Sequence, residues 1–476
     1  MEIVYADGKE LHNITCTLCE DNHPKTKILS IHSGDKSYDL FFCENCKVYF
    51  YYPFEPPKYD SRGESEESKI SMFRYNVEFA VDYLLTIFPL MLIEDYLRNI
   101  KEREGKVKFL DVGSGVGINL LYSKYYFGFD TFGIEPAKYG KLAEHFLDVS
   151  VFSGYLEDFV SDEKFHIITS MQVIEHIKDP VSFLRKLKEL LKETGILIMT
   201  TPHSEHIHRE HAVALCTLSP GEHVIIYNEA SMAYLLEKAG FRNYKVLRDI
   251  GGDLLVFAFN GVIQDDNIIK KDLFNFSLAL KKLIEISKIA ISNLEKDINN
   301  PYYVGFLYRL FKYYMIQGNY IEAFRLILDA RHKLILKPKQ ILNNLNNINT
   351  LEEWGKVFIY PYHCFLHYYA MLKLNFFSNI PEAIEYFNMS YKLCEAWLTK
   401  SFSGDIESKD IFYSSLFHEA YALYFNGEYE KAYEKLKLFI SFSSNEPDYV
   451  KIKPPQDLIS RAEELIKLCE NKVRRC

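Results

Sequence analysis

An acid and three closely spaced glycines follow an apolar run at residues 109–120, FLDVGSGVGINL. Glycines let the backbone lie directly against a ligand, where a Cβ atom would clash. A dinucleotide-binding turn needs Gly-x-Gly-x-x-Gly, but the third position is Ile118 in one register and Leu120 in the other. The segment therefore predicts a cofactor-binding turn that does not fit a dinucleotide. Its residues are Asp111, Gly113, Gly115 and Gly117.

The spacing Asp-x-Gly-x-Gly-x-Gly resembles the first motif of the class I S-adenosylmethionine (SAM) methyltransferases. SAM has no pyrophosphate, so it does not require the third glycine of the dinucleotide motif. The resemblance implies that Asp111 faces the ammonium end of SAM, directly or through water. It also implies that Glu135, which ends the next predicted strand 22 residues after Gly113, accepts hydrogen bonds from both ribose hydroxyls.

Two later segments extend this resemblance. GYLEDF, residues 154–159, stands where the family contacts adenine, and FHIITSMQVIEHIKDP, residues 165–180, matches the fourth strand and its exit. Four motifs in the expected order predict SAM as the cofactor. The implied contacts are Leu156 on the adenine ring, Glu157 or Asp158 near its amino group, and Gln172 and Val173 at the methionine end.

An oxygen or carbon acceptor of a methyl group must lose a proton, and histidine is the side chain best suited to remove it near neutral pH. His223, in the loop after the fifth predicted strand, is the first candidate, and we expect the adjacent Glu222 to orient its ring or to belong to the proton path. His176, in VIEHIKDP after the fourth strand, is the second. The alternative is a local structural role for His223 and a capping role for His176.

The segment TPHSEHIHREH, residues 201–211, holds four histidines at the carboxyl edge of the predicted sheet, where ligands of open α/β folds bind. We interpret it as a polar lid that contacts substrate or solvent. The alternative is a catalytic metal site on a helix face shared by His208 and His211. The histidines are His203, His206, His208 and His211.

Four of the nine cysteines form the pairs CTLC and CENC, which are separated by 23 residues. Four thiolates complete a tetrahedral shell, so this spacing predicts a structural Zn²⁺ site, with an iron–sulfur centre as the alternative. A closed shell leaves no position for a substrate. The intervening segment alternates apolar and polar residues, as a short hairpin would. The cysteines are Cys16, Cys19, Cys43 and Cys46.

Strands must position these residues, and strand-like runs alternate with helical patterns from about residue 107 to 202, with further strands near 245–248 and 254–259. This order predicts an α/β fold, a doubly wound SAM-methyltransferase sheet with helices on both faces. We expect a zinc-binding unit over residues 1–60 and the methyltransferase domain over residues 61–265.

The strand signal disappears in residues 266–476, which we expect to form an all-α, repeat-like domain. Three segments each predict a helix, a tight turn and a second helix, and they resemble tetratricopeptide repeats. The turns lie 61 and 48 residues apart instead of 34, so a degenerate α-solenoid and an irregular bundle both fit. The turns are at Gly318, Ser378-Asn379 and Gly427, and small residues follow at Ala323, Ala383 and Ala432.

The cysteine unit, the SAM motifs and GEHVIIYN resemble zinc-bearing sugar C-methyltransferases over residues 10 to about 260. Members that act on nucleotide-linked keto-sugars have Tyr-His-Glu-His where this chain has PGEH, residues 220–223, so the tyrosine is absent. The resemblance implies methyl transfer to a sugar or other small hydroxylated metabolite, for example in surface-glycan synthesis. The alternatives are a protein or glycoconjugate acceptor recruited by the helices, and a non-catalytic SAM-binding scaffold.

The net charge of −9 argues against a general nucleic-acid binder. The polar, acidic start does not resemble a signal peptide, and no apolar run has the length of a membrane span. We therefore expect a cytoplasmic protein whose partners are a small-molecule or glycan substrate and a protein bound by the helical domain.

Overall fold

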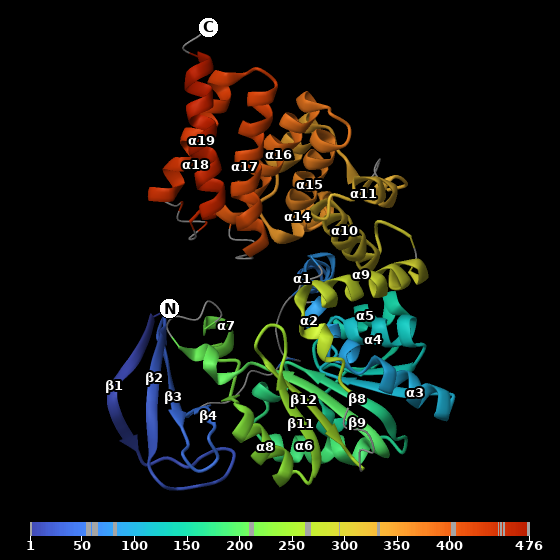
Figure 1. The fold of residues 1–476 in the computed structure, drawn as a ribbon. Helices are drawn as coiled ribbons and strands as arrows, with labels where there is room; N and C mark the ends of the chain where they lie inside the picture. Colours follow the sequence, from blue (N-terminus) through green and yellow to red (C-terminus); the bar gives the residue numbers. More distant parts are fainter. Residues whose placement is uncertain are drawn as a thin grey trace. The chain divides into compact units, whose positions relative to one another are not determined.

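A computed structural model of the chain describes most of the sequence and divides it into two compact units (Figure 1). The larger unit comprises Met1–Glu64 and Asp82–Asn293, and the smaller comprises Ser65–Val81 and Leu294–Cys476. The described residues are 2–53, 59, 65–79, 83–208, 214–261, 268–294, 296–330, 334–400, 406–445, 447, 450 and 453–473.

The larger unit contains a seven-stranded sheet in the order β11-β12-β9-β8-β5-β6-β7. The strands β5 to β9 are parallel, whereas β12 is antiparallel to both of its neighbours. The chain runs from β5 to β6 and β7 and then returns to β8 on the other side of β5, which confirms the predicted doubly wound sheet. The strands are β5 (Lys108–Val112), β6 (Asp130–Ile134), β7 (Ser150–Phe152), β8 (Phe165–Met171), β9 (Leu191–Thr201), β11 (Asn243–Arg248) and β12 (Leu254–Phe259).

Helices cover both faces of this sheet, as Figure 1 shows for α6 and α8 on one side and α2 and α9 on the other. The strands β8 and β12 are buried along almost their whole length, as expected for strands covered on both faces. The helices of this unit are α2 (Tyr83–Leu92), α3 (Glu94–Glu104), α4 (Ile118–Tyr122), α5 (Gly140–Leu147), α6 (Pro180–Leu190), α7 (Ala214–Leu218), α8 (Glu229–Lys238) and α9 (Phe276–Asn293).

The cysteine-bearing segment forms a second sheet in the same unit. The antiparallel pair β2 and β3 is the hairpin predicted between the cysteine pairs. The sequence did not indicate that this sheet continues into β10, which follows β9 in the chain and pairs with β4. The N-terminal segment therefore shares a sheet with a strand that follows β9 in the chain, and it does not stand alone. The strands, in sheet order, are β1 (Glu2–His12), β2 (Lys25–Ser33), β3 (Lys36–Phe42), β4 (Tyr49–Tyr51) and β10 (Ile225–Ile226).

Two helices lie in different units from those expected. The helix α1 (Glu66–Phe79) packs against α10 of the smaller unit, where a Cβ atom added at Gly305 would lie 2.2 Å from the Val77 carbonyl oxygen. The helix α9 packs against α2 of the larger unit, and Lys282 pairs with Glu94 at 3.1 Å. Among the described helices, none alone is long and apolar enough to span a membrane, although α1 and α2 as a bent pair pass a test of length and composition.

The smaller unit is all-α, and each helix from α15 to α18 packs against the next one in the chain. The three predicted turns are present, with left-handed backbone at Gly318, Ser378 and Gly427. The alanine after each turn is fully buried against the paired helix. The remaining helices are α10 (Pro301–Ile316), α11 (Tyr320–Ile327), α13 (Pro338–Leu345), α14 (Leu351–Val357), α15 (Tyr362–Asn375), α16 (Ile380–Thr399), α17 (Ile406–Phe425), α18 (Tyr429–Ser444) and α19 (Gln456–Val473).

Candidate active site

A cavity of about 510 Å³ opens where β5, β6 and β8 end. The strand order reverses between β5 and β8, and open α/β sheets bind their ligands at such a point. The predicted SAM-binding residues on its wall are Gly113, Gly115, Glu135, Leu156, Glu157, Gln172 and Val173. Three further predicted residues lie outside the wall, namely Asp111, Gly117 and Asp158.

The glycine turn follows β5 and lies tightly against the exit of β8. Gly113 has a φ of +72°, and a Cβ atom at this position would lie 2.4 Å from Cγ2 of Val173. The Gly113 amide also donates to the carbonyl oxygen of Ile134, at 2.8 Å, which fixes the turn to β6. Gly117, with a φ of +77°, forms the N-cap of α4. Glycine is therefore required at position 113 for two reasons. Its φ lies in the left-handed region, and a Cβ atom would clash with Val173.

Glu135 is a buried carboxylate directly after β6. It accepts hydrogen bonds from the backbone amides of Gly115, at 2.7 Å, and Ala137, at 2.8 Å. Burial raises the pKa of this carboxyl group to about 7. Each carboxylate oxygen can accept more than one hydrogen bond, so two hydroxyl groups of a ligand could still donate to it.

Asp111 lies beneath the glycine turn, outside the residues that line the cavity. Its Oδ1 accepts from the Thr169 hydroxyl at 2.6 Å and from the Asn119 amide at 3.4 Å. Burial raises its pKa to about 6. The short side chain ends at the neighbouring strand, so its direct contacts tie β5 to β8 and to α4.

The remaining predicted contacts lie on two short segments. Leu156 is buried, begins a single 3₁₀ turn, Leu156–Asp158, and presents an apolar side chain to the cavity. Glu157 is exposed and still lines the cavity, whereas Asp158 is exposed and lies outside the lining. Gln172 follows β8 with a φ of +55°, and its amide donates to Asp253 at 3.0 Å.

His176 lines the cavity from the single turn Ile174–His176 after β8. Its Nδ1 lies 3.1 Å from the carbonyl oxygen of Glu222 and 3.0 Å from the hydroxyl of Tyr59. A carbonyl oxygen only accepts, so Nδ1 carries the proton and Nε2 is the basic nitrogen of the neutral ring. Tyr59 was not predicted, because one of 35 tyrosines outside any motif has no distinguishing pattern.

His223 lies behind His176, and it is absent from the cavity wall. The two ring centroids are 4.7 Å apart, and His223 is only 7% exposed. Its Nδ1 donates to the carbonyl oxygen of Thr217 at 2.7 Å. Burial, followed by repulsion from His176, lowers its pKa to about 4. The structure brings both histidines together but gives His176, and not His223, access to the cavity, whose wall also includes Glu222.

Glu175 is a third ionisable group beside these histidines, and the sequence pattern did not distinguish it. It is 1% exposed, and its Oε2 accepts from the Thr201 hydroxyl at 3.0 Å. Its Oε1 has no hydrogen-bond partner among the described residues. Burial raises its pKa to about 8. One potential ligand atom from each of Glu175, His176 and His223 lies within 4.8 Å of the others.

The histidine-rich segment after β9 lies apart from this group. Nε2 of His203 pairs with Glu229 at 3.0 Å, and Nδ1 of His206 lies 3.5 Å from Asp253. His208 is exposed, and His211 lies outside the described residues. Within the described part of the chain, these histidines do not converge on a metal-binding geometry.

The four predicted cysteines converge on one point. The Sγ distance is 3.6 Å both from Cys16 to Cys46 and from Cys19 to Cys43. A Zn–S bond of about 2.3 Å places tetrahedral sulfurs about 3.8 Å apart, so the arrangement fits such an ion. Both pairs share one turn geometry, in which the first cysteine's carbonyl oxygen accepts from the fourth residue after it. That fourth residue, Glu20 or Lys47, has a φ of +60°.

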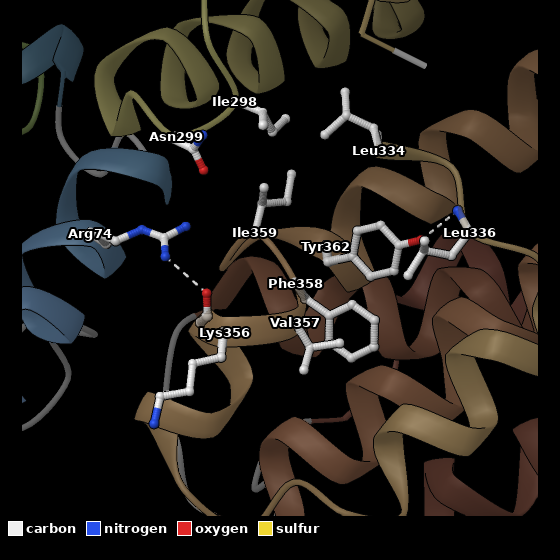
Figure 2. A pocket seen from close by; sticks show the side chains of 11 residues that line it. Arg74, Ile298, Asn299, Leu334, Leu336, Lys356, Val357, Phe358, Ile359 and Tyr362 are labelled. Atoms are coloured by element: carbon white, nitrogen blue, oxygen red, sulfur yellow. Dashed lines mark hydrogen bonds between the residues drawn. The ribbon is translucent and has the colours of Figure 1, made fainter. Parts of the chain in front are cut away.

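A smaller cavity, of about 310 Å³, lies within the all-α unit (Figure 2). Arg74 donates to the carbonyl oxygen of Gly355 at 2.8 Å and pairs with Glu78. Lys356 pairs with Glu67. Both basic side chains already hold carboxylates, so this cavity presents a largely neutral lining.

Residues 88–246 match a family model described as a methyltransferase domain. This chain contains a class I SAM-dependent methyltransferase domain. Ubiquinone biosynthesis O-methyltransferases are similar in sequence. That of Actinobacillus pleuropneumoniae serotype 5b (strain L20) is 34% identical over 125 residues, 24% of this chain and 52% of the relative. That of Glaesserella parasuis serovar 5 (strain SH0165) is 36% identical over 106 residues, 20% and 44% of the two chains. The chain spans about half the length of the curated relatives it matches.

Solved methyltransferase structures also align with this domain. The plantazolicin methyltransferase BpumL in complex with SAH aligns over 41% of this chain and 97% of its own, with 14% identity and a TM-score of 0.31. An O-methyltransferase family protein from Burkholderia thailandensis aligns over 35% of this chain and 55% of its own, with 14% identity and a TM-score of 0.30.

Proposed function

We propose that this protein transfers the methyl group of SAM to a hydroxyl group of a small molecule, with a sugar as the leading acceptor class. The observation that carries the proposal is the composition of the cavity wall, which contains the glycine turn, Glu135 and His176 together. The relatives named ubiquinone biosynthesis O-methyltransferases support oxygen as the accepting atom.

The cavity wall suits the separate parts of SAM. Gly115 has open space at its Cβ position, which lets the backbone approach the aminocarboxypropyl and ribose groups. Glu135 would accept the ribose hydroxyls, and Leu156 offers an apolar surface to adenine. SAM supplies a methyl group bound to a positively charged sulfur, and the residues around it need only hold that sulfur in line with the acceptor.

We place the acceptor hydroxyl at His176, which follows the residues expected at the methionine end. The acceptor oxygen forms the new bond to the methyl carbon while the carbon–sulfur bond breaks and its electron pair stays on sulfur. The hydroxyl proton passes to water in the cavity or to Nε2 of His176, which lines the cavity beside the buried Glu175 and His223. Polar side chains on the cavity wall, Lys178, Asp179 and Glu222, favour an acceptor with several hydroxyl groups.

We further propose that the four cysteines hold a structural Zn²⁺ ion. Their spacing and convergence support it, because four thiolates satisfy the ion completely. The strand β4 connects the cysteine segment to the neighbourhood of His223, because the amide of Tyr51 in β4 donates to the carbonyl oxygen of Val224 at 3.0 Å. The ion would therefore stabilise the acceptor side of the cavity without taking part in the reaction.

The proposal is tested with methyl-labelled SAM, the purified protein and a panel of sugars, nucleotide sugars and fractions of a host extract. We expect label in a small hydroxylated product, and we expect His176→Ala to lower turnover about 10²–10⁴-fold while SAM affinity is retained. His145→Ala is the matched control, because His145 is exposed and lies outside the cavity wall. Tight SAM binding without transfer to any fraction would favour the scaffold alternative.

A further inference from the structure

We propose that Glu175, His176 and His223 bind a divalent transition-metal ion at the edge of the cavity, separate from the four cysteines. One ligand atom of each residue lies within 4.8 Å of the others. Metal–nitrogen and metal–oxygen bonds of about 2.1 Å hold neighbouring ligand atoms about 3–4 Å apart. Nε2 of His176 already lies 4.0 Å from Oε1 of Glu175, so small side-chain movements would complete the site.

Both imidazole rings are held in the manner of metal ligands. A ligating histidine usually donates its other ring N–H to a carbonyl or carboxylate, which fixes the ring and the tautomer. Nδ1 of His223 is 2.7 Å from the Thr217 carbonyl oxygen, and Nδ1 of His176 is 3.1 Å from that of Glu222. In both neutral rings, Nε2 is then the nitrogen that carries the lone pair.

The unpartnered oxygen of Glu175 is an independent indication of a missing cation. Buried polar atoms in native proteins almost always have a partner, and an exception calls for an unseen ion or water. Oε1 of Glu175 is fully buried without a hydrogen-bond partner among the described residues, while Oε2 accepts from Thr201. Burying a carboxylate is costly unless a positive charge compensates it, and a divalent ion between the two imidazole rings would supply that charge.

The backbone brings the three ligands together from two distant segments. The Val224 amide donates to the Glu175 carbonyl oxygen at 2.7 Å, so the turn after β8 and the segment before β10 are joined beside the ligands. Two nitrogens and one carboxylate oxygen suit borderline divalent ions such as Mn²⁺, Fe²⁺ or Zn²⁺. This ligand set differs from that of the cysteine site, which offers four sulfur atoms.

The ion's role in catalysis rests on the proposed function. Three protein ligands leave coordination positions for an acceptor oxygen, and His176 is the ligand that faces the cavity. A divalent ion lowers the pKa of a hydroxyl group that it contacts, so the acceptor would lose its proton at neutral pH. His176 and His223 would then act as ligands, and their removal would stop transfer for that reason.

Mn²⁺ titration followed by electron paramagnetic resonance tests the site without SAM or acceptor. The full chain is first dialysed against EDTA, and elemental analysis verifies that the cysteine-bound ion is retained. We expect one Mn²⁺ bound per chain, with affinity lowered more than about tenfold in Glu175→Gln and in His223→Ala. The matched controls are Glu189→Gln and His145→Ala, which change an exposed residue of each type outside the cavity wall and should bind Mn²⁺ as the wild type does.

Calorimetry with SAM separates this inference from the proposed function. The ligand variants should bind SAM within about threefold of the wild type, because none of the three residues is expected to contact the cofactor. If either variant fails to fold, Glu175→Asp and His223→Gln replace it. Absence of Mn²⁺ binding in the wild type, or unchanged binding in the ligand variants, overturns the metal site. A wild-type protein that binds Mn²⁺ but does not bind SAM would instead count against the proposed function.

Discussion

Glu135 is a buried carboxylate whose ionisation is unfavourable in the free protein. Its pKa is raised by burial from its ordinary value of 4.5 to about 7, so the folded state binds more protons than the unfolded state between these values. Its contribution therefore lowers the free energy of unfolding as the pH rises from about 4.5 to 7. In the proposed SAM site, the charged form of Glu135 would accept the ribose hydroxyls. Ligand binding and ionisation are consequently linked at this residue.

We predict that SAM affinity rises between pH 6 and pH 8 and that Glu135→Gln removes the dependence due to this group. At pH 8 the variant should bind SAM and S-adenosylhomocysteine about 1–3 kcal/mol more weakly, because an amide cannot accept as many hydrogen bonds as a carboxylate. Calorimetry at both pH values measures this. The ionisable groups of SAM itself titrate in the same way with either protein, so they do not affect the comparison. Glu189→Gln is the control, because Glu189 is exposed and outside the cavity wall, and equal pH dependence in all three proteins would contradict the assignment.

Gly113 and Gly115 form a matched pair of substitutions in the glycine turn. Alanine at Gly113 combines left-handed backbone strain, about 1–2 kcal/mol, with overpacking against Val173, about 1–3 kcal/mol. Alanine at Gly115 carries the strain alone, since no atom lies within 4 Å of its Cβ position. We predict a greater loss of unfolding free energy for Gly113→Ala in urea titrations. Adding Val173→Ala should recover part of that loss, and a double variant as unstable as Gly113→Ala would refute the contact.

The short strand β10 lies between the cysteine site and the side of the cavity where we propose that the acceptor binds. It pairs with β4 through Ile225–Phe50 and Ile226–Tyr49, and it begins two residues after His223. The same hydrophobic cluster contains Cys43, Phe50 and Ile225. A structural ion at the cysteines would thus hold His223 in place through the pairing of β4 with β10. These strands are distant in sequence, so no local motif indicates the link.

We predict that Cys43→Ser removes one zinc ion per chain and lowers methyl transfer more than SAM affinity. The proposed SAM-binding wall is built on β5, β6 and β8, whereas the displaced element would be β10. Elemental analysis, calorimetry with SAM and the transfer assay give the three readouts. Cys216→Ser is the control, because Cys216 is exposed and outside the quartet. Unchanged metal content in Cys43→Ser would refute the site.

At the scale of the whole molecule, the two compact units differ in their tryptophan content. The chain has two tryptophans, Trp354 and Trp397, and both are fully buried in the helical unit. Tryptophan fluorescence therefore reports the unfolding of that unit, while SAM binds the methyltransferase unit. A ligand that binds only folded protein stabilises by about 2.7 kcal/mol at one hundred times its dissociation constant.

We predict that S-adenosylhomocysteine raises the melting temperature of the methyltransferase unit and leaves the tryptophan-detected transition unchanged. Scanning calorimetry detects both transitions, and fluorescence detects the helical unit alone. In Glu135→Gln the ligand-dependent shift should shrink. An equal shift in both signals would show that the two units unfold as one.

The sequence by itself determined the features that depend on local spacing. Alternating strands and helices predicted the doubly wound sheet, and the glycine turn and Glu135 could be located because both follow directly from strand ends. Two Cys-x-x-Cys pairs predicted a converging quartet, because each pair forms its own turn. These patterns are encoded within a few residues of backbone, so no distant contact is needed to recognise them.

Only the tertiary structure decided which residues meet from distant parts of the chain. It placed His176 on the cavity wall and His223 behind it, and it brought the unpredicted Glu175 and Tyr59 to the same place. It also assigned α1 to the helical unit and joined β4 to β10. Each of these outcomes depends on how apolar faces pack over long sequence separations, and local periodicity carries no information about that packing.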